Sequence, residues 1–197
     1  VFEMMLFTLW IYLPGFLVNT FAMMWGKWLP KTGYGPWPID GGRMHKDGNR
    51  LLGDGKTWNG LIGGSLTSGL LCYLMTMVPE NWIFISPTEA ATGWAASAFV
   101  LGTFLGFTSL VGDSTGSYFK RRKGMKREGD VSSKAPLLDT LPFAISVFVF
   151  GQLFLTGSAH GDRELIVPMV LLVVITPILH RSFNLIGYKI GWKDVPY

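Results

Sequence analysis

The run AATGWAASAFVLGTFLGFTSLV at residues 90–111 contains no charged residue, and GDSTGSYFKRR at residues 112–122 follows it directly. Crossing the hydrocarbon core of a bilayer takes about 20 apolar helical residues, each rising about 1.5 Å. The run therefore predicts a transmembrane helix whose end, marked by the charges behind it, lies at a membrane surface. Continuation of this helix past Gly112 would place four polar residues on one face, at i, i+4, i+7 and i+8: Asp113, Ser117, Lys120 and Arg121.

Four more apolar runs flank this one, at Met4–Trp28, Leu61–Val78, Leu141–Leu155 and Leu165–Leu179. The last two are short for a span and need Pro136–Thr140 and the stretch up to about Gly187 to complete them. The first run is longer than the core of a signal peptide and has no basic residue before it, so we expect it to be retained. The pattern predicts an all-α membrane protein of about five transmembrane helices.

Composition agrees with this fold class. Only 15% of the 197 residues are charged, and Phe, Met and Trp number 14, 9 and 8, whereas a soluble domain carries about 25% charged residues. The single cysteine, Cys72, lies in an apolar run and allows no internal disulfide, so we expect a buried or lipid-facing thiol. Small residues recur at four-residue spacing, as helices in close contact in lipid require: Gly60, Gly64 and Ser68, and Gly102 and Gly106.

The distribution of basic residues predicts the orientation. All but one of the 17 Lys and Arg residues, Arg163, fall in residues 27–59, 112–135 or the tail after residue 179. Because basic loops stay cytoplasmic, we expect the N-terminus outside, the C-terminus inside, and a single polytopic domain in the cell membrane with two long cytoplasmic loops at about 29–59 and 112–135. The net charge of +4 is then a signal of topology and not of nucleic-acid binding.

The first long loop ends in Gly53-Asp54-Gly55-Lys56-Thr57-Trp58-Asn59-Gly60, which opens directly into an apolar run. Glycines let backbone N–H groups approach a phosphate, and the N-terminus of a helix attracts anions. A flexible loop with an interfacial lysine and a threonine N-cap explains the same residues, and the residue types alone leave both interpretations open. A Walker-type loop is not favoured, because Arg50 stands where that motif needs glycine.

A second cluster combines the polar face of residues 113–121 with Asp139, at the start of the fourth apolar run. Oxygen ligands suit Mg²⁺, and lysine and arginine suit phosphate oxygens. Snorkelling to anionic headgroups explains the later cations Arg122, Lys123, Lys126 and Arg127. It does not explain Asp113, whose charge near hydrocarbon is costly unless it is paired or bound to a metal. Asp139 alone is equally well explained as an acid favoured by the helix dipole.

The ordered motifs resemble the CDP-archaeol synthases, the archaeal relatives of bacterial CDP-diacylglycerol synthases. The resemblance covers about Leu13–Phe143 and rests on Pro38-Ile39-Asp40-Gly41, Asp47-Gly48-x-Arg50, the Gly53–Gly60 segment and Gly112-Asp113-x3-Ser117-x2-Lys120-Arg121-Arg122-x-Gly124. Asp139 resembles a later Asp of the family. A second Asp that often follows three residues on is replaced here by Pro142, which leaves more of the metal site to Asp113 and Asp139.

The resemblance implies a Mg²⁺-dependent reaction in which CTP and an isoprenoid-ether lipid phosphate give CDP-archaeol and pyrophosphate. The lipid comes from the cytoplasmic leaflet, so the active site is expected on that side of the membrane. As hypotheses, we assign catalytic roles to Asp113, Asp139 and Lys120, metal binding to Asp113 and Asp139, and substrate binding to Asp40, Gly55, Lys56, Thr57, Asn59, Ser117 and Arg121.

Two rival functions have weaker support. A CDP-alcohol phosphotransferase needs an Asp-Gly-x2-Ala-Arg signature, and Asp47-Gly48 is followed here by Asn49, Arg50 and Leu51. A transporter or channel for an anionic solute is disfavoured by five helices without inverted repeats and without charge in mid-membrane. The sequence leaves the oligomeric state open.

Overall fold

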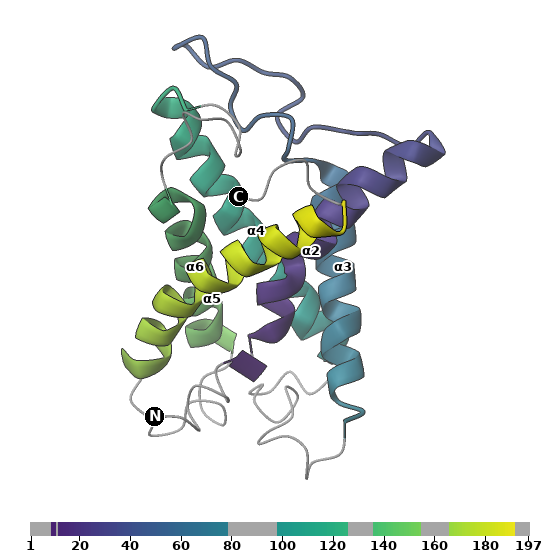
Figure 1. Ribbon diagram of the computed structural model, residues 1–197, viewed down its shortest axis with the longest axis vertical. Coiled ribbons are helices and arrows are strands. Elements are labelled where there is room, and N and C mark those ends of the chain that lie inside the picture. The colour runs from purple at the N-terminus through teal and green to yellow at the C-terminus, as the bar shows by residue number, and fades with distance from the viewer. Residues whose placement is uncertain (1–8, 11, 79–97, 126–135, 155–165, 192–197) are drawn as a thin grey trace.

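The structure is a computed structural model that describes residues 9–10, 12–78, 98–125, 136–154 and 166–191 (Figure 1). Most of these residues are helical, the main exception being the loop of residues 33–57, and no strand occurs among them. The helices, with one short 3₁₀ helix η1, are α2 (Leu13–Trp28), η1 (Leu29–Thr32), α3 (Trp58–Met75), α4 (Ala98–Arg122), α5 (Pro136–Phe154) and α6 (Ile166–Lys189). The predicted fold class, an all-α protein, is confirmed.

The helix boundaries follow the sequence pattern closely. Helix α4 continues past Gly112 as far as Arg122, so the condition under which the four polar residues share one face is met. Helix α5 begins at Pro136, where a proline costs no intrahelical hydrogen bond. Helix α2 starts only at Leu13, with a proline in its first turn, so the Met4–Trp28 run is not one continuous helix in the described residues. Two connections between apolar runs, Pro79–Thr88 and Gly157–Glu164, would lie outside the membrane in the orientation that the basic residues predict, and both are outside the described residues.

Helices α2, α3 and α4 approach one another closely through small residues. A side chain at Gly64 would meet the backbone of Ala22 in α2 at 3.0 Å, and one at Gly102 would meet the Cβ of Cys72 at 2.3 Å. The Ser68 hydroxyl donates to the Pro14 carbonyl at 2.9 Å. The predicted packing role of the small residues is therefore confirmed. Cys72 itself is buried, as expected.

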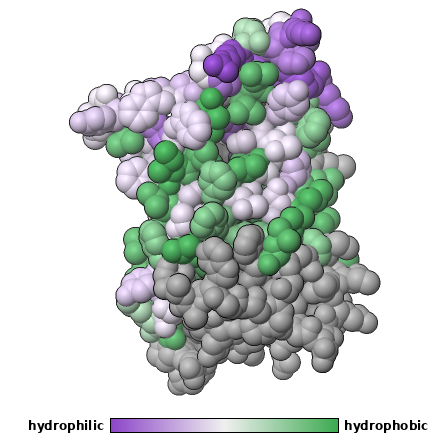
Figure 2. All heavy atoms as spheres, turned by 180° about the vertical axis from the view of Figure 1, so that it is seen from behind, coloured by the Kyte–Doolittle hydropathy of each residue, from purple (hydrophilic) through white to green (hydrophobic). Residues whose placement is uncertain are grey.

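The interior of the bundle is apolar, and much of its flank is apolar as well. The buried cluster combines α2, α4 and α5 with Leu61 of α3. The exposed flank carries large apolar side chains, among them Ile62, Leu66 and Leu70 of α3 and Phe104 and Phe107 of α4. Figure 2 shows hydrophobic residues along the helices and hydrophilic residues gathered at one end. An apolar flank of this kind suits contact with lipid.

Length and composition alone single out α4 as a candidate membrane span among the described helices, with a shorter apolar stretch at Thr140–Gly151 in α5. Glycine, serine and threonine within α3 lower its hydropathy, and the described part of α2 has 16 residues. The same small residues that permit close packing thus weaken the hydropathy signal.

The helices alternate in direction, so the helix ends that the basic residues predict to be cytoplasmic gather at one end of the bundle (Figure 1). The loop of residues 33–57 lies at that end, beside the end of α4 (Figure 1). The Lys27 ammonium group at the end of α2 donates to the Gly191 carbonyl just after α6 at 3.2 Å. Helix α6 crosses the bundle obliquely over α2 and α5 (Figure 1).

Candidate active site

The loop of residues 33–57 is organised around the carboxylate of Asp40, whose side chain is almost completely buried. Arg50 donates to both carboxylate oxygens, from Nη2 at 2.6 Å and from Nε at 3.2 Å. Backbone N–H groups add three more hydrogen bonds, from Leu52 and Gly53 at 3.0 Å each and from Gly42 at 3.1 Å. Five donors around one carboxylate fold a glycine-rich segment into a defined shape.

These contacts change the acidity of both charged partners. Burial alone would raise the pKa of Asp40, but the hydrogen bonds from Arg50 and from three backbone N–H groups outweigh it and hold the pKa well below its usual value. The hydrogen bond to Asp40 raises the pKa of Arg50, and a second carboxylate, Asp54, adds to this at 2.7 Å. Asp40 and Arg50 are therefore both ionised at neutral pH.

The loop is closed where it meets α3. Ile39 N–H donates to the Lys56 carbonyl at 2.8 Å, and Trp58 N–H donates to the Trp37 carbonyl at 2.8 Å. Thr57 is the N-cap of α3, because its hydroxyl accepts from Gly60 N–H at 3.1 Å. One of the two interpretations of Thr57 left open by the sequence, an N-cap, is therefore present in the structure.

Asn59 is the second residue of α3 and is buried. Its amide group donates to the Tyr34 carbonyl at 3.0 Å, and its oxygen accepts from Trp37 N–H at 3.3 Å. Gly35 lies against the Asn59 amide with a φ of +90°, and a side chain there would come within 2.6 Å of it. Asn59 thus holds the start of the loop against α3.

The two sequence clusters meet at Lys56 and Asp113. The Lys56 ammonium group donates to the Asp113 carboxylate, and both side chains are mostly buried. The charge that was expected to need a partner near hydrocarbon therefore has one, supplied by a residue 57 positions earlier in the chain. This contact joins the Gly55-Lys56-Thr57 segment to the polar face of α4.

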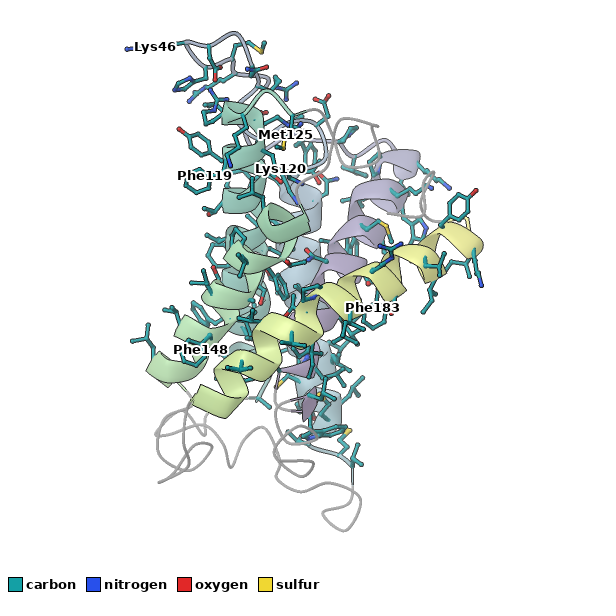
Figure 3. All side chains as sticks on the ribbon, turned by 60° about the vertical axis from the view of Figure 1, so that its left-hand side comes forward. Lys46, Phe119, Lys120, Met125, Phe148 and Phe183 are labelled. Carbon is teal, nitrogen blue, oxygen red and sulfur yellow. The ribbon has the colours of Figure 1, made fainter. Side chains whose placement is uncertain are left out.

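Further along α4, the polar face turns inward. Ser117 and Lys120 are both 6% exposed, and Lys120 projects from the opposite side of α4 to the exposed Phe119 (Figure 3). The Arg121 guanidinium group lies against the loop at Gly53, where a Cβ would come within 3.2 Å of its Nε. Gly53 has a φ of +95°, so the glycine allows both the turn and the approach of the cation.

Asp139 lies in the first turn of α5, and its side chain is outside the described residues. The backbone beside it is well placed: the Leu138 carbonyl would be 2.3 Å from a Cβ at Gly116, and Pro142 packs over the same glycine. The backbone of Asp139 in α5 therefore lies beside α4 about one helical turn further along that helix than Asp113. The expected meeting of the two carboxylates stays a prediction.

One interpretation of the sequence is wrong. Arg122 was expected to snorkel to lipid headgroups, but its Nη1 donates to both carboxylate oxygens of Asp47, at 2.7 and 2.8 Å. Its Nη2 donates to the Arg50 carbonyl at 2.6 Å, and the guanidinium group lies over the Tyr118 ring at 5.2 Å from the centroid. Asp47 and Arg122 were both visible in the sequence motifs, but nothing there paired them.

A groove of about 390 Å³ opens between the loop and α4. Aliphatic and aromatic side chains form much of its wall, and the exposed Arg43 stands at it. The lining residues are Ile39, Asp40, Gly41, Arg43, Leu51, Leu52 and Tyr118.

The donor set at this end of the bundle suits a divalent cation only in part. Among the residues that the structure describes, no group of three or more His, Cys, Asp or Glu is arranged to hold a metal. Asp113 offers one carboxylate, and the second expected ligand, Asp139, starts from the adjacent turn of α5. Two carboxylates leave most of the coordination sphere of Mg²⁺ to water and phosphate oxygens, which is the usual arrangement for this ion with nucleotide substrates.

The fold and the site define a helical membrane protein with a cluster of cations and carboxylates suited to a polyphosphate. A family model described as CarS-like, CDP-archaeol synthase, matches residues 1–197. The chain belongs to this family. The CDP-archaeol synthase of Thermococcus gammatolerans is 36% identical over 193 residues, covering 98% of this chain and 96% of the relative. That of Methanosarcina barkeri is 36% identical over 197 residues, covering 94% and 99%.

A solved structure agrees with this assignment. It is described as an intramembrane enzyme for archaeal membrane lipids biosynthesis. It is 27% identical in sequence, covers 85% of this chain and 91% of its own, and superimposes with a TM-score of 0.53. The resemblance inferred from the motifs is thereby confirmed.

Proposed function

We propose that this protein transfers the cytidylyl group of CTP to an isoprenoid-ether lipid phosphate, giving CDP-archaeol and pyrophosphate, at the end of the bundle that carries the loop of residues 33–57. Membership in the CDP-archaeol synthase family supports the reaction. The observation that carries the location is the contact between Lys56 and Asp113, which brings the two main family motifs together.

In this reaction an oxygen of the lipid phosphate attacks the α-phosphorus of CTP, the α–β bridging bond breaks, and pyrophosphate leaves with the bond electrons. No covalent intermediate with the protein is required, so the protein contributes position and charge. Lys56, Lys120 and Arg121 supply three cations from two elements, and we assign them to the phosphate oxygens of CTP or of the lipid. Ser117, buried beside Lys120, assists as a hydroxyl donor.

Asp113 and Asp139 would hold Mg²⁺, whose chemistry when bound is to neutralise the charge that develops on the phosphate oxygens. A cation on Asp113 would compete with Lys56 for the same carboxylate. The displaced ammonium group would then be available to a phosphate oxygen. The N-terminus of α3, reached through Gly55 and Thr57, adds a favourable dipole for the same anion.

Asp40 and Asn59 have a different role in this proposal. All the hydrogen bonds given by the structure to these two side chains come from or go to the loop itself. We therefore propose that they shape the substrate-binding loop, and that Lys56, Arg121 and Ser117 contact the substrates.

The topology is part of the same proposal. Five membrane-spanning helices, with the N-terminus outside and the C-terminus inside, place the charged end in the cytoplasm, where CTP is available. The clustering of Lys and Arg at that end supports this orientation. The lipid phosphate then enters from the cytoplasmic leaflet without leaving the membrane.

The test uses purified protein, Mg²⁺, radiolabelled CTP or ATP, and lipid phosphate with either isoprenoid-ether or diacyl chains. We expect the CTP label to move into the organic phase with the isoprenoid-ether substrate. Asp113→Asn should reduce this transfer at least about 1000-fold, because it removes a carboxylate ligand of the cation that would neutralise the reacting phosphates. The matched control is Asp54→Asn, at an exposed carboxylate paired with Arg50, which should stay within about threefold of wild type.

Near-normal turnover by a folded Asp113→Asn variant would remove Asp113 from the mechanism. Flux of an anionic tracer through proteoliposomes, without consumption of CTP, would instead support a transporter.

A further inference from the structure

We propose that Arg122 is a positioning residue, which fixes the register of the loop of residues 33–57 on α4 without contacting either substrate. Through the loop it sets Lys56 against Asp113, so the inference rests on the catalytic roles proposed above for that pair. The motif that contains Arg122 also contains Lys120 and Arg121, which the proposal assigns to phosphate. The contacts of Arg122 indicate a role different from that of Lys120 and Arg121.

The guanidinium group of Arg122 is committed to the loop. Nη1 donates to both oxygens of Asp47, and Nη2 donates to the carbonyls of Arg50 at 2.6 Å and Asn49 at 3.4 Å. Its flat face lies over Tyr118, which comes one helical turn earlier in α4. The side chain is 16% exposed. Paired, stacked and largely buried, this cation has little surface left for a phosphate.

The partner, Asp47, is equally well placed to receive it. Asn49 N–H donates to Asp47 Oδ1 at 3.0 Å, and His45 N–H donates to the Asn49 carbonyl at 2.8 Å. The segment from His45 to Arg50 thus presents to Arg122 the carboxylate of Asp47 and the carbonyls of Asn49 and Arg50 together. The hydrogen bond from Asn49, followed by the charge of Arg122, lowers the pKa of Asp47, so the pair is ionised across the physiological range.

The loop then runs down α4 in register. Arg122 holds the carbonyl of Arg50, whose own side chain binds Asp40. Three residues further on, Gly53 lies against the Arg121 guanidinium group. Three residues after that, Lys56 reaches Asp113. Arg122 is the outermost of these three contacts along α4.

Release of the outermost contact should lower the fraction of molecules whose loop is in register. A partly populated competent state weakens apparent substrate affinity in proportion to its population, and saturating substrate restores it. We therefore expect Asp47→Asn to raise the KM for CTP roughly tenfold, with kcat within about threefold of wild type. Arg122→Gln should act in the same direction and roughly 30-fold, because it also loses the two carbonyls and the stacking on Tyr118.

The decisive measurement is the double variant. If Arg122 acts through Asp47, Asp47→Asn combined with Arg122→Gln should behave like Arg122→Gln alone. The exchanged pair, Asp47→Arg with Arg122→Asp, should recover part of the lost kcat/KM. Lys123→Gln is the matched control, since it removes one cation from the exposed neighbouring position and should leave KM unchanged.

A second measurement does not depend on chemistry. Hydrogen exchange at the Leu51, Leu52 and Gly53 N–H groups, whose acceptors are Arg43 and Asp40, should accelerate in Asp47→Asn and in Arg122→Gln, but not in Lys123→Gln. Should Arg122→Gln fail to fold, Asp47→Asn carries both tests.

The proposal is overturned if the effects of the two substitutions multiply, or if Asp47→Asn leaves KM and exchange unchanged while Arg122→Gln raises KM. That second pattern would make Arg122 a direct ligand of CTP. The outcome is different if the proposed catalytic site is wrong but the positioning role of Arg122 is right. Asp113→Asn would then retain turnover, while Asp47→Asn and Arg122→Gln would still accelerate hydrogen exchange in the loop.

Discussion

Replacing Asp40 with asparagine tests whether this carboxylate organises the loop or binds substrate. Oδ2 of Asp40 accepts three N–H donors, from Arg50, Leu52 and Gly53, and Oδ1 accepts two, from Arg50 and Gly42. Asparagine has one oxygen and one NH₂ group. In either orientation its NH₂ group faces at least two donors, and the negative charge that balances Arg50 is lost.

The cost follows from this count. A hydrogen bond to a charged group contributes about 1.5–3 kcal/mol, so the less costly orientation, which loses the two bonds at Oδ1, gives up about 3–6 kcal/mol before water intervenes. The Arg50 side chain is 25% exposed, so water replaces part of this loss, and about 2–4 kcal/mol remains as destabilisation of the loop. At about 1.4 kcal/mol for each factor of ten, local opening becomes roughly 30- to 1000-fold more frequent.

Hydrogen exchange at the Leu52 and Gly53 N–H groups measures this opening directly, and limited proteolysis after Lys46, at the exposed tip of the loop (Figure 3), reports it independently. The control, Asp54→Asn, removes the more exposed partner of Arg50 and should change opening by about 1 kcal/mol or less. The reasoning is refuted if Asp40→Asn leaves exchange at the wild-type rate. Loss of CTP binding at that unchanged rate would show that Asp40 contacts the substrate.

Three further outcomes are expected. Gly116→Ala should lower the thermal unfolding temperature in detergent and reduce activity. The new Cβ would lie 2.3 Å from the Leu138 carbonyl and would displace the turn that carries Asp139. The control Gly26→Ala makes only an ordinary contact at 3.5 Å and should be neutral or stabilising by about 0.5–1 kcal/mol. Thr57→Ala should cost about 1 kcal/mol through loss of the N-cap, measured by thermal unfolding, and Thr57→Ser should restore it. The pKa of Asp40 is lower in the folded protein than in the unfolded chain. The stabilisation that ionised Asp40 gives the folded state is therefore fully present above the unfolded-state pKa of about 4 and is lost as the pH falls below it. The difference in unfolding temperature between wild type and Asp40→Asn should thus be constant from about pH 5 to 8 and shrink below about pH 4.

The helices were predictable because each one satisfies a local rule. Apolar length, glycine spacing and the polar face after Gly112 are all visible within a single segment, and the structure follows them to Arg122. The proline at position 136 likewise starts α5, as its missing N–H favours. The family was recognisable for a related reason, since its motifs are contiguous stretches in a fixed order.

The pairings at the site were not predictable, because they join segments far apart in the chain. Arg122 meets Asp47 across 75 positions, and Lys56 meets Asp113 across 57. Arg121 and Arg122 are adjacent residues of the same type, yet consecutive side chains on a helix differ by about 100° in direction. One therefore lies against Gly53 and the other against Asp47. Which direction faces the loop depends on how the loop folds around Asp40.

Helix α4 links these two levels of the structure. Within the bundle, Gly102 and Gly106 bring it against α3, and Gly112 and Gly116 bring it against α5. Because an α-helix is stiff, these close contacts also fix the direction of its last two turns, which leave the bundle with the charged residues. The Lys56 and Arg122 contacts then attach the loop to a helix whose position is already set. Glycines without any chemistry of their own thus determine where Asp113 and Lys120 stand, so packing and catalysis in this protein constrain the same helix.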